Sequence, residues 1–156
     1  MENEREQLRR LLKQESLIFG DFTLASGKKS AFYFDSKRTT LLPDGAWLTA
    51  REILRVVRDN KIDATAIGGL TLGADPIVCP VAALSHAEGP KLRAFIVRKE
   101  AKEHGTGKRI EGNLPTGSRV IIVDDVVTTG ATTAAAAETL LEAGCASVKV
   151  LAIARD

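Results

Sequence analysis

The segment Val120–Thr133, VIIVDDVVTTGATT, decides the fold that this sequence predicts. Its first four residues are β-branched and apolar, which is typical of a parallel strand buried on both faces. Asp124 and Asp125 follow directly, and a short Thr/Gly loop then leads into an alanine-rich helix. We therefore expect a strand–loop–helix unit with two acids at the carboxyl end of its strand.

This unit carries the groups that a sugar phosphate needs. The Thr/Gly loop places hydroxyls and free backbone N–H groups at a helix N-terminus, where the helix dipole favours a phosphate. The two carboxylates lie at the end of the sheet where open α/β proteins bind ligands, and they suit ribose hydroxyls. A βα turn without a ligand is the alternative, because Thr, Gly and Asp also make good turns and caps. Adjacent acids favour the ligand site, since like charges repel without a cation or hydroxyl partner.

Composition is that of an ordinary globular protein. The chain has 156 residues, of which 44% are hydrophobic and 27% charged, so we expect one domain over 1–156. Basic and acidic residues nearly balance, 22 against 20, which argues against a nucleic-acid or membrane partner. Two cysteines give no disulfide framework, the first residues are charged, and no apolar run is long enough to span a bilayer. We expect a soluble cytoplasmic protein.

Alternating strands and helices predict a doubly wound, mostly parallel α/β sheet flanked by helices. In chain order we expect a helix over 43–59, a strand over 64–67 ending at Gly68-Gly69, a loop over 70–76 and a helix to about 83, a strand over 92–97, the strand and helix of the central segment with Gly144 as C-cap, and a strand over 148–153.

Residues 1–40 lie outside this alternation. Leucines at helical spacing predict an amphipathic helix over about 5–14. Two β-prone runs flank a turn at 26–29 and predict a hairpin over 19–35, which holds most of the few aromatic residues. We expect this hairpin to pack as a small hood over the sheet edge.

Residues 98–117 combine glycines and charges with little apolar periodicity. An irregular segment of this length is usually functional, so we expect a flexible catalytic loop. A surface hairpin with solvated charges is the alternative. The catalytic loop is favoured over the surface hairpin because a cluster of cations in it would close, as a lid, over a charged leaving group. These cations are Lys99, Lys102, His104, Lys108 and Arg109.

Four segments, in this order, resemble the orotate phosphoribosyltransferases. The loop VIIVDDVVTTGATT is typical of type I phosphoribosyltransferases as a whole, whereas the arm's Arg-Lys-x-x-Lys-x-His pattern and the hairpin are similar to the orotate enzymes specifically. The other three segments are the hairpin FGDFTLASGKKSAFYFD at 19–35, the loop GGLTLGADPI at 68–77 and the arm RKEAKEHGTGKRIEG at 98–112. Together the resemblance covers the chain from about Phe19 onward.

This resemblance implies transfer of phosphoribosyl from phosphoribosyl pyrophosphate to orotate, giving orotidine 5′-phosphate and pyrophosphate in pyrimidine (UMP) biosynthesis. It implies Mg²⁺ held mainly through the substrate, near Asp124 and Asp125, and a homodimer whose arm reaches the partner site. It implies Lys102, His104, Asp124 and Asp125 as catalytic residues. The implied contacts are Arg98, Lys99, Lys102 and His104 for pyrophosphate, Asp124 and Asp125 for the ribose hydroxyls, Thr128, Thr129, Gly130, Ala131 and Thr132 around the 5′-phosphate, with Thr128 also near the base, and Tyr33 and Phe34 along the orotate ring. Val126 and Val127 are also implied as substrate-binding residues.

The chain departs from the family pattern in three places. Ala25 stands where some members carry a lysine, so that phosphate contact is lost or comes from Lys28 or Lys29. The loop reads Thr71-Leu72 where some members carry a lysine. Members usually follow the last strand with an arginine for the orotate carboxylate and then continue, whereas this sequence stops at Asp156. Either Arg155 takes that role, or the arginine lies beyond Asp156 and the chain is shortened.

Three other functions remain open on the sequence alone. One is a phosphoribosyltransferase for a purine or another base. A second is a non-catalytic regulator that binds phosphoribosyl pyrophosphate, which would need a separate basic surface for nucleic acid. A third is an inactive fragment without the carboxylate contact. No Ser-His-Asp or Cys-His motif predicts a protein nucleophile, and the two histidines lack metal-site spacing.

Overall fold

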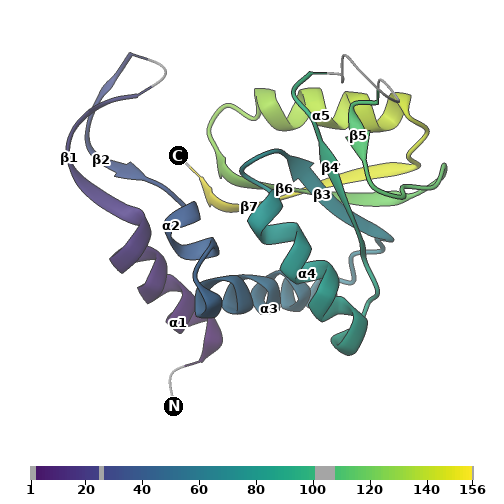
Figure 1. Ribbon diagram of the computed structural model, residues 1–156, viewed down its shortest axis with the longest axis horizontal. Coiled ribbons are helices and arrows are strands. Elements are labelled where there is room, and N and C mark those ends of the chain that lie inside the picture. The colour runs from purple at the N-terminus through teal and green to yellow at the C-terminus, as the bar shows by residue number, and fades with distance from the viewer. Residues whose placement is uncertain (1–2, 25–26, 101–107, 156) are drawn as a thin grey trace.

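The computed structural model describes residues 3–24, 27–100 and 108–155 (Figure 1). Its centre is a five-stranded sheet in the order β5-β4-β3-β6-β7. Strands β3, β4, β6 and β7 run parallel, and the short β5 pairs antiparallel with β4. The strands are β3 (Ala66–Leu70), β4 (Arg93–Val97), β5 (Ile110–Glu111), β6 (Arg119–Val127) and β7 (Ser147–Arg155). The predicted mostly parallel sheet is confirmed.

Helices cover both faces of this sheet, which is the doubly wound arrangement (Figure 1). On one face Ile121 and Val123 of β6 pack against α3 and α4, and on the other Val120 and Ile122 pack against α5. The alternation follows from the period of two along a strand. The helices are α3 (Pro43–Asp59), α4 (Asp75–Glu88) and α5 (Ala131–Glu142). Within the described residues, no helix is both long and apolar enough to cross a bilayer.

Three predicted boundaries shift. Strand β3 extends through Gly68 and Gly69, which pair with β4, so these glycines lie within the strand and do not end it. Helix α4 continues past Pro80 and Ala83 to Glu88. Strand β6 extends beyond the predicted 120–123 to Val127, because β7 continues to pair with it. The predicted C-cap of α5 is confirmed to within one residue, since Gly144 follows the cap at φ 90°.

The N-terminal segment begins with α1 (Glu4–Leu11), followed by a π-helical turn η1 (Leu12–Ser16) where the sequence predicts α-helix to about 14. The hairpin of β1 (Leu17–Thr23) and β2 (Lys29–Phe34) is confirmed. The hairpin projects away from the central sheet and does not lie over the sheet edge (Figure 1). The short α2 (Lys37–Thr40) connects it to α3.

One arginine ties the N-terminal segment to the body. The Arg51 guanidinium of α3 donates to Glu4 of α1 at 2.9 Å and to Glu88 of α4 at 2.8 Å. It also lies over the ring of Trp47, 5.1 Å from the ring centroid. Three helices therefore meet at this one cation.

Candidate active site

The acidic pair lies in β6, at the carboxyl end of the parallel strands. Asp124 and Asp125 are both half-buried. Burial, and next the charge of Asp125, raises the pKa of the Asp124 carboxyl above its ordinary value. Two negative charges are thus held side by side at the edge where α/β sheets bind ligands.

Asp125 is held by donors from two segments. The Ser36 hydroxyl donates to Oδ2 at 2.8 Å, and the Val126 backbone N–H donates to Oδ1 at 3.0 Å. The loop after β3 closes the third side, because a Cβ on Gly73 would lie only 3.1 Å from Oδ1. The carboxylate is therefore fixed where three segments meet.

Beyond the acids, the Thr/Gly loop ends at the N-terminus of α5. Gly130 is the N-cap, at φ 78°, and it offers no side-chain acceptor to the first helical N–H groups. The Ala131 N–H donates to the Thr129 hydroxyl at a long distance, 3.4 Å. Thr128, Thr129, Ala131 and Thr132 are exposed. Accessible N–H groups at a helix N-terminus, ringed by hydroxyls, are an arrangement that commonly binds anions in proteins.

The loop after β3 lies beside the pair and contributes no cation. The Thr71 hydroxyl donates to Asp75 at 2.7 Å, at the start of α4. Leu72 is largely exposed, and the peptide bond between Thr71 and Leu72 is cis. The sequence departure at Thr71-Leu72 thus falls in the loop that approaches Asp125.

Two of the predicted cations lie at the start of the arm. Arg98 directly follows β4, and its guanidinium lies 3.7 Å from the Glu111 carboxylate. Lys99 is exposed, and its carbonyl accepts from the Arg109 guanidinium at 3.4 Å. Lys102 and His104 lie outside the described residues. The described part of the arm thus starts at the same sheet edge as the acidic pair.

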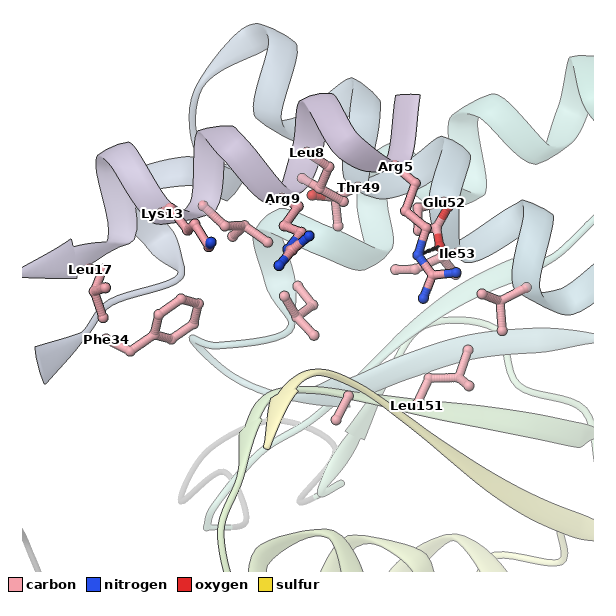
Figure 2. A pocket seen from close by; sticks show the side chains of 14 residues that line it. Arg5, Leu8, Arg9, Lys13, Leu17, Phe34, Thr49, Glu52, Ile53 and Leu151 are labelled. Atoms are coloured by element: carbon pink, nitrogen blue, oxygen red, sulfur yellow. Dashed lines mark ion pairs between the residues drawn. The ribbon is translucent and has the colours of Figure 1, made fainter. Parts of the chain in front are cut away.

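Tyr33 and Phe34 are neighbours on β2, so their side chains point to opposite faces of the hairpin. Tyr33 is 45% exposed and lies 5.7 Å from the Phe22 ring, centroid to centroid. Phe34 instead lines a cavity between the N-terminal helix and β7 (Figure 2). The structure therefore does not place these two predicted base contacts on one surface.

That cavity is distinct from the acidic pair. Its volume is about 490 Å³ and its lining is largely apolar. Three cations of the N-terminal segment also line it, namely Arg5, Arg9 and Lys13. Figure 2 shows Arg5 paired with Glu52 on α3, at 3.6 Å. Neither aspartate nor any residue of the Thr/Gly loop lines it.

Comparison with known proteins fits this geometry. A family model of the phosphoribosyl transferase domain matches residues 68–156. A relative from Rhodopirellula baltica named orotate phosphoribosyltransferase is 42% identical over 92% of this chain and 76% of its own length. One of the same name from Aquifex aeolicus is 42% identical over 96% of this chain and 82% of its own length. The chain belongs to the orotate phosphoribosyltransferase family.

Solved structures agree with the family. A Mycobacterium tuberculosis orotate phosphoribosyltransferase superposes with a TM-score of 0.84 at 36% identity, over 98% of this chain and 85% of that one. The same enzyme in complex with phosphoribosyl pyrophosphate gives 0.79 at 33% identity, over 98% and 83%. An adenine phosphoribosyltransferase from Saccharomyces cerevisiae, at 18% identity, shares the fold.

Sequence reasoning assigns no individual role to three residues near the acidic pair of this family member. They are Ser36, Gly73 and Lys37. The Lys37 ammonium lies 3.0 Å from Asp35, and that hydrogen bond, with the charges of Asp35 and Asp125, raises the pKa of Lys37. No local sequence pattern predicts the role of Ser36, because its hydrogen-bond partner Asp125 lies 89 positions away along the chain. Gly73 belongs to the family's loop motif, but the motif does not reveal its closeness to Asp125.

Proposed function

We propose that this protein transfers the phosphoribosyl group of phosphoribosyl pyrophosphate to orotate, with Mg²⁺, in UMP biosynthesis. One observation carries the proposal: an acidic pair and a glycine-capped helix N-terminus converge at one sheet edge in a member of the orotate family. We further propose that it acts as a cytoplasmic homodimer, with the arm of one subunit reaching the partner site.

Phosphate and ribose fit the two halves of this edge. The 5′-phosphate accepts from the N–H groups that begin α5, enclosed by the residues from Thr128 to Thr132. The ribose hydroxyls donate to Asp124 and Asp125. The raised pKa of Asp124 supports this arrangement, since a donor to the buried carboxylate offsets its cost of burial.

Bond breaking is assisted by charge and needs no protein nucleophile. Cleavage of the C1–pyrophosphate bond builds positive charge on the ribose and negative charge on the diphosphate. The carboxylates of the acidic pair lie near the positive charge that builds on the ribose. We assign four residues to the negative charge of the departing diphosphate, namely Arg98, Lys99, Lys102 and His104. Preorganised charges of this kind are worth the most in a site that excludes water.

Magnesium fits the acidic pair. Burial and mutual repulsion leave Asp124 with a raised pKa, and a cation would relieve both effects. Among the described residues, no group of three or more His, Cys, Asp or Glu is placed to hold a metal. Mg²⁺ is suited to such a site, because it commonly takes one or two carboxylates and completes its shell with substrate phosphates and water. When bound, it stabilises the charge of the departing diphosphate.

We assign the orotate ring to the hairpin side of the site, against Tyr33, with Phe34 in the same strand. Arg155 supports a contact with the orotate carboxylate, because it is exposed and lies opposite Val127 in the β6–β7 ladder. That register places its backbone next to the start of the Thr/Gly loop.

A spectrophotometric assay tests the function. The protein is mixed with Mg²⁺, phosphoribosyl pyrophosphate and orotate, and the loss of orotate absorbance is followed, with adenine, hypoxanthine and uracil in parallel. We expect turnover of orotate alone. Turnover of a purine without orotate turnover would refute the orotate assignment.

Substitution of the arm lysine tests the leaving-group assignment. We expect Lys102→Ala to lower kcat by about 10²–10³-fold, the typical cost of one charge-stabilising contact in a closed site. The melting temperature should stay unchanged. Lys91→Ala, at an exposed lysine before the amino end of β4, is the control and should keep full activity. Unchanged turnover in Lys102→Ala would remove Lys102 from the mechanism.

A further inference from the structure

Ser36 makes an unusual use of its hydroxyl. It is the N-cap residue of α2, a position where a serine hydroxyl commonly accepts a hydrogen bond from the first helical turn. Its side chain makes no such bond. The residue is fully buried, and its hydroxyl points to the half-buried Asp125 of β6, at 2.8 Å. The Ser36 hydroxyl thus binds the acidic pair, while the Asp35 carboxylate accepts the first N–H of α2, from Lys37, at 3.2 Å.

This bond defines the orientation of the carboxylate. An ionised carboxylate has about four lone-pair directions. Ser36 takes one on Oδ2 and the Val126 N–H takes one on Oδ1, so two protein donors fix the plane of the group. Beyond these two donors, lone-pair directions remain on the carboxylate for a hydroxyl from outside. Gly73 of the loop after β3 leaves room for this carboxylate, since a Cβ there would lie 3.1 Å from Oδ1.

We propose that Ser36 is a positioning residue for ribose binding, holding Asp125 in the orientation that accepts the sugar hydroxyls. The inference rests on the proposed role of Asp125 as a ribose contact. Ser36 follows the hairpin that carries Tyr33, so it also connects the segment assigned to the base with the strand assigned to the sugar.

A purely structural role for Ser36 has a matched control in the same segment. Ser16 is also fully buried, and its hydroxyl shares a 2.7 Å hydrogen bond with the Thr39 hydroxyl of α2. That bond anchors α2 to the π-helical turn and does not involve Asp125. If Ser36 served only to hold α2 in place, Ser16→Ala and Ser36→Ala would have similar consequences.

The experiment measures binding of phosphoribosyl pyrophosphate, with Mg²⁺, by calorimetry. The proteins are the wild type, Ser36→Ala, Ser16→Ala, Asp125→Ala and the Ser36→Ala/Asp125→Ala double variant. We expect Ser36→Ala to raise Kd about tenfold, the effect of losing one hydrogen bond to a charged group. Ser16→Ala should change Kd less than twofold. In the Asp125→Ala background, Ser36→Ala should add less than twofold, because the group it orients is gone.

Steady-state kinetics give a second readout. Ser36→Ala should raise the KM for phosphoribosyl pyrophosphate and leave the KM for orotate within twofold. The proposal is overturned if Ser36→Ala leaves Kd within twofold, if it weakens binding equally with and without Asp125, or if Ser16→Ala matches it. Wild-type protein that binds phosphoribosyl pyrophosphate but consumes no orotate would count against the proposed reaction alone, and the binding comparison would still decide the role of Ser36.

Discussion

Asp124 and Asp125 are adjacent in sequence yet differ in environment. Asp125 accepts from the Ser36 hydroxyl and from a backbone N–H, so its charge is stabilised on both oxygens. Asp124 is dominated by burial and by the neighbouring charge. The sequence presents them as an equivalent pair, and only the packing around β6 tells them apart. Asp124 is therefore the group whose charge opposes folding.

We expect Asp124→Asn to stabilise the fold and to weaken activity. The pKa of Asp124 is raised in the folded state, so its charged form is disfavoured there. Folded protein then binds more protons than unfolded protein between the two pKa values, and stability falls as pH rises through that interval. The variant escapes this loss. Urea unfolding should show a larger free energy of unfolding for Asp124→Asn at neutral pH.

The pH dependence provides the control for this effect. Below the ordinary carboxyl pKa, Asp124 is protonated in both the folded and unfolded states, so wild type and variant should converge. A variant that is less stable than wild type at neutral pH would contradict the assignment of Asp124 as a destabilising charge.

Gly130 is the residue whose backbone conformation the Thr/Gly loop requires. At φ 78°, an alanine would adopt the left-handed region at a cost of about 1–2 kcal/mol. We expect Gly130→Ala to raise the KM for phosphoribosyl pyrophosphate, because the loop would relax away from the geometry that presents the N–H groups of α5. Gly117→Ala is the matched control, since Gly117 has φ 80° and open space around it before the amino end of β6. It should lower stability similarly and leave that KM unchanged.

At the scale of elements, β3 positions the site through closeness. A Cβ on Gly68 would collide with the Phe95 carbonyl oxygen, and one on Gly69 with the Val123 carbonyl oxygen and, at 2.6 Å, with the Ala74 Cβ. The two glycines therefore let β3 lie tightly between β4, β6 and α4. Val123 directly precedes the acidic pair, so this packing also sets where the pair lies.

We expect Gly69→Ala to destabilise the fold by at least about 1–3 kcal/mol, the usual cost of overpacking a core. It should also lower affinity for phosphoribosyl pyrophosphate, because displacement of the Val123 carbonyl moves Asp124. Thermal unfolding and calorimetry measure the two effects. Gly20→Ala in the hairpin is the control, since its Cβ would meet only the movable Phe22 ring, at 3.2 Å. A Gly69→Ala protein of wild-type stability would refute the packing argument.

The types of the helices and strands were predictable from sequence because their apolar patterns are strong. The ends of the strands differ from the prediction where backbone pairing with a neighbouring strand outweighs the local sequence signal. The strand predicted over 120–123 continues to Val127 because the backbone of β7 pairs with it despite the two charges. Gly68 and Gly69 indicate a strand end locally but pair with β4. Pro80 does not end α4, and the helix runs five residues beyond the predicted end at Ala83.

At the scale of the whole molecule, the N-terminal segment is joined to the α/β body at several distant points. Arg51 links α1, α3 and α4, and Ser36 links the region after the hairpin to β6. These contacts join residues from 37 to 89 positions apart. The sequence predicted the hairpin itself, but its attachment and direction depend on contacts that no local pattern encodes.

We expect Arg51→Ala to lower the melting temperature while leaving kcat unchanged, because the contacts of the cation are with Glu4, Glu88 and Trp47 and not with the acidic pair. The loss should be greatest at low salt, where ion pairs are least screened. Arg93→Ala, at an exposed arginine on β4 with no ion pair shown among the described residues, is the control. Equal melting temperatures for the two variants would show that the three-helix junction contributes no stability.

The same three-helix junction determines what tryptophan fluorescence can report about this protein. Trp47 is the sole tryptophan of the chain, and it stands half-exposed under the Arg51 guanidinium. Its emission is therefore a natural probe for separation of α1 from α3 during denaturation. The end of the sheet that carries the acidic pair has no indole of its own, so quenching titrations with substrates should be silent. A tryptophan introduced in place of Tyr33 would supply the missing signal.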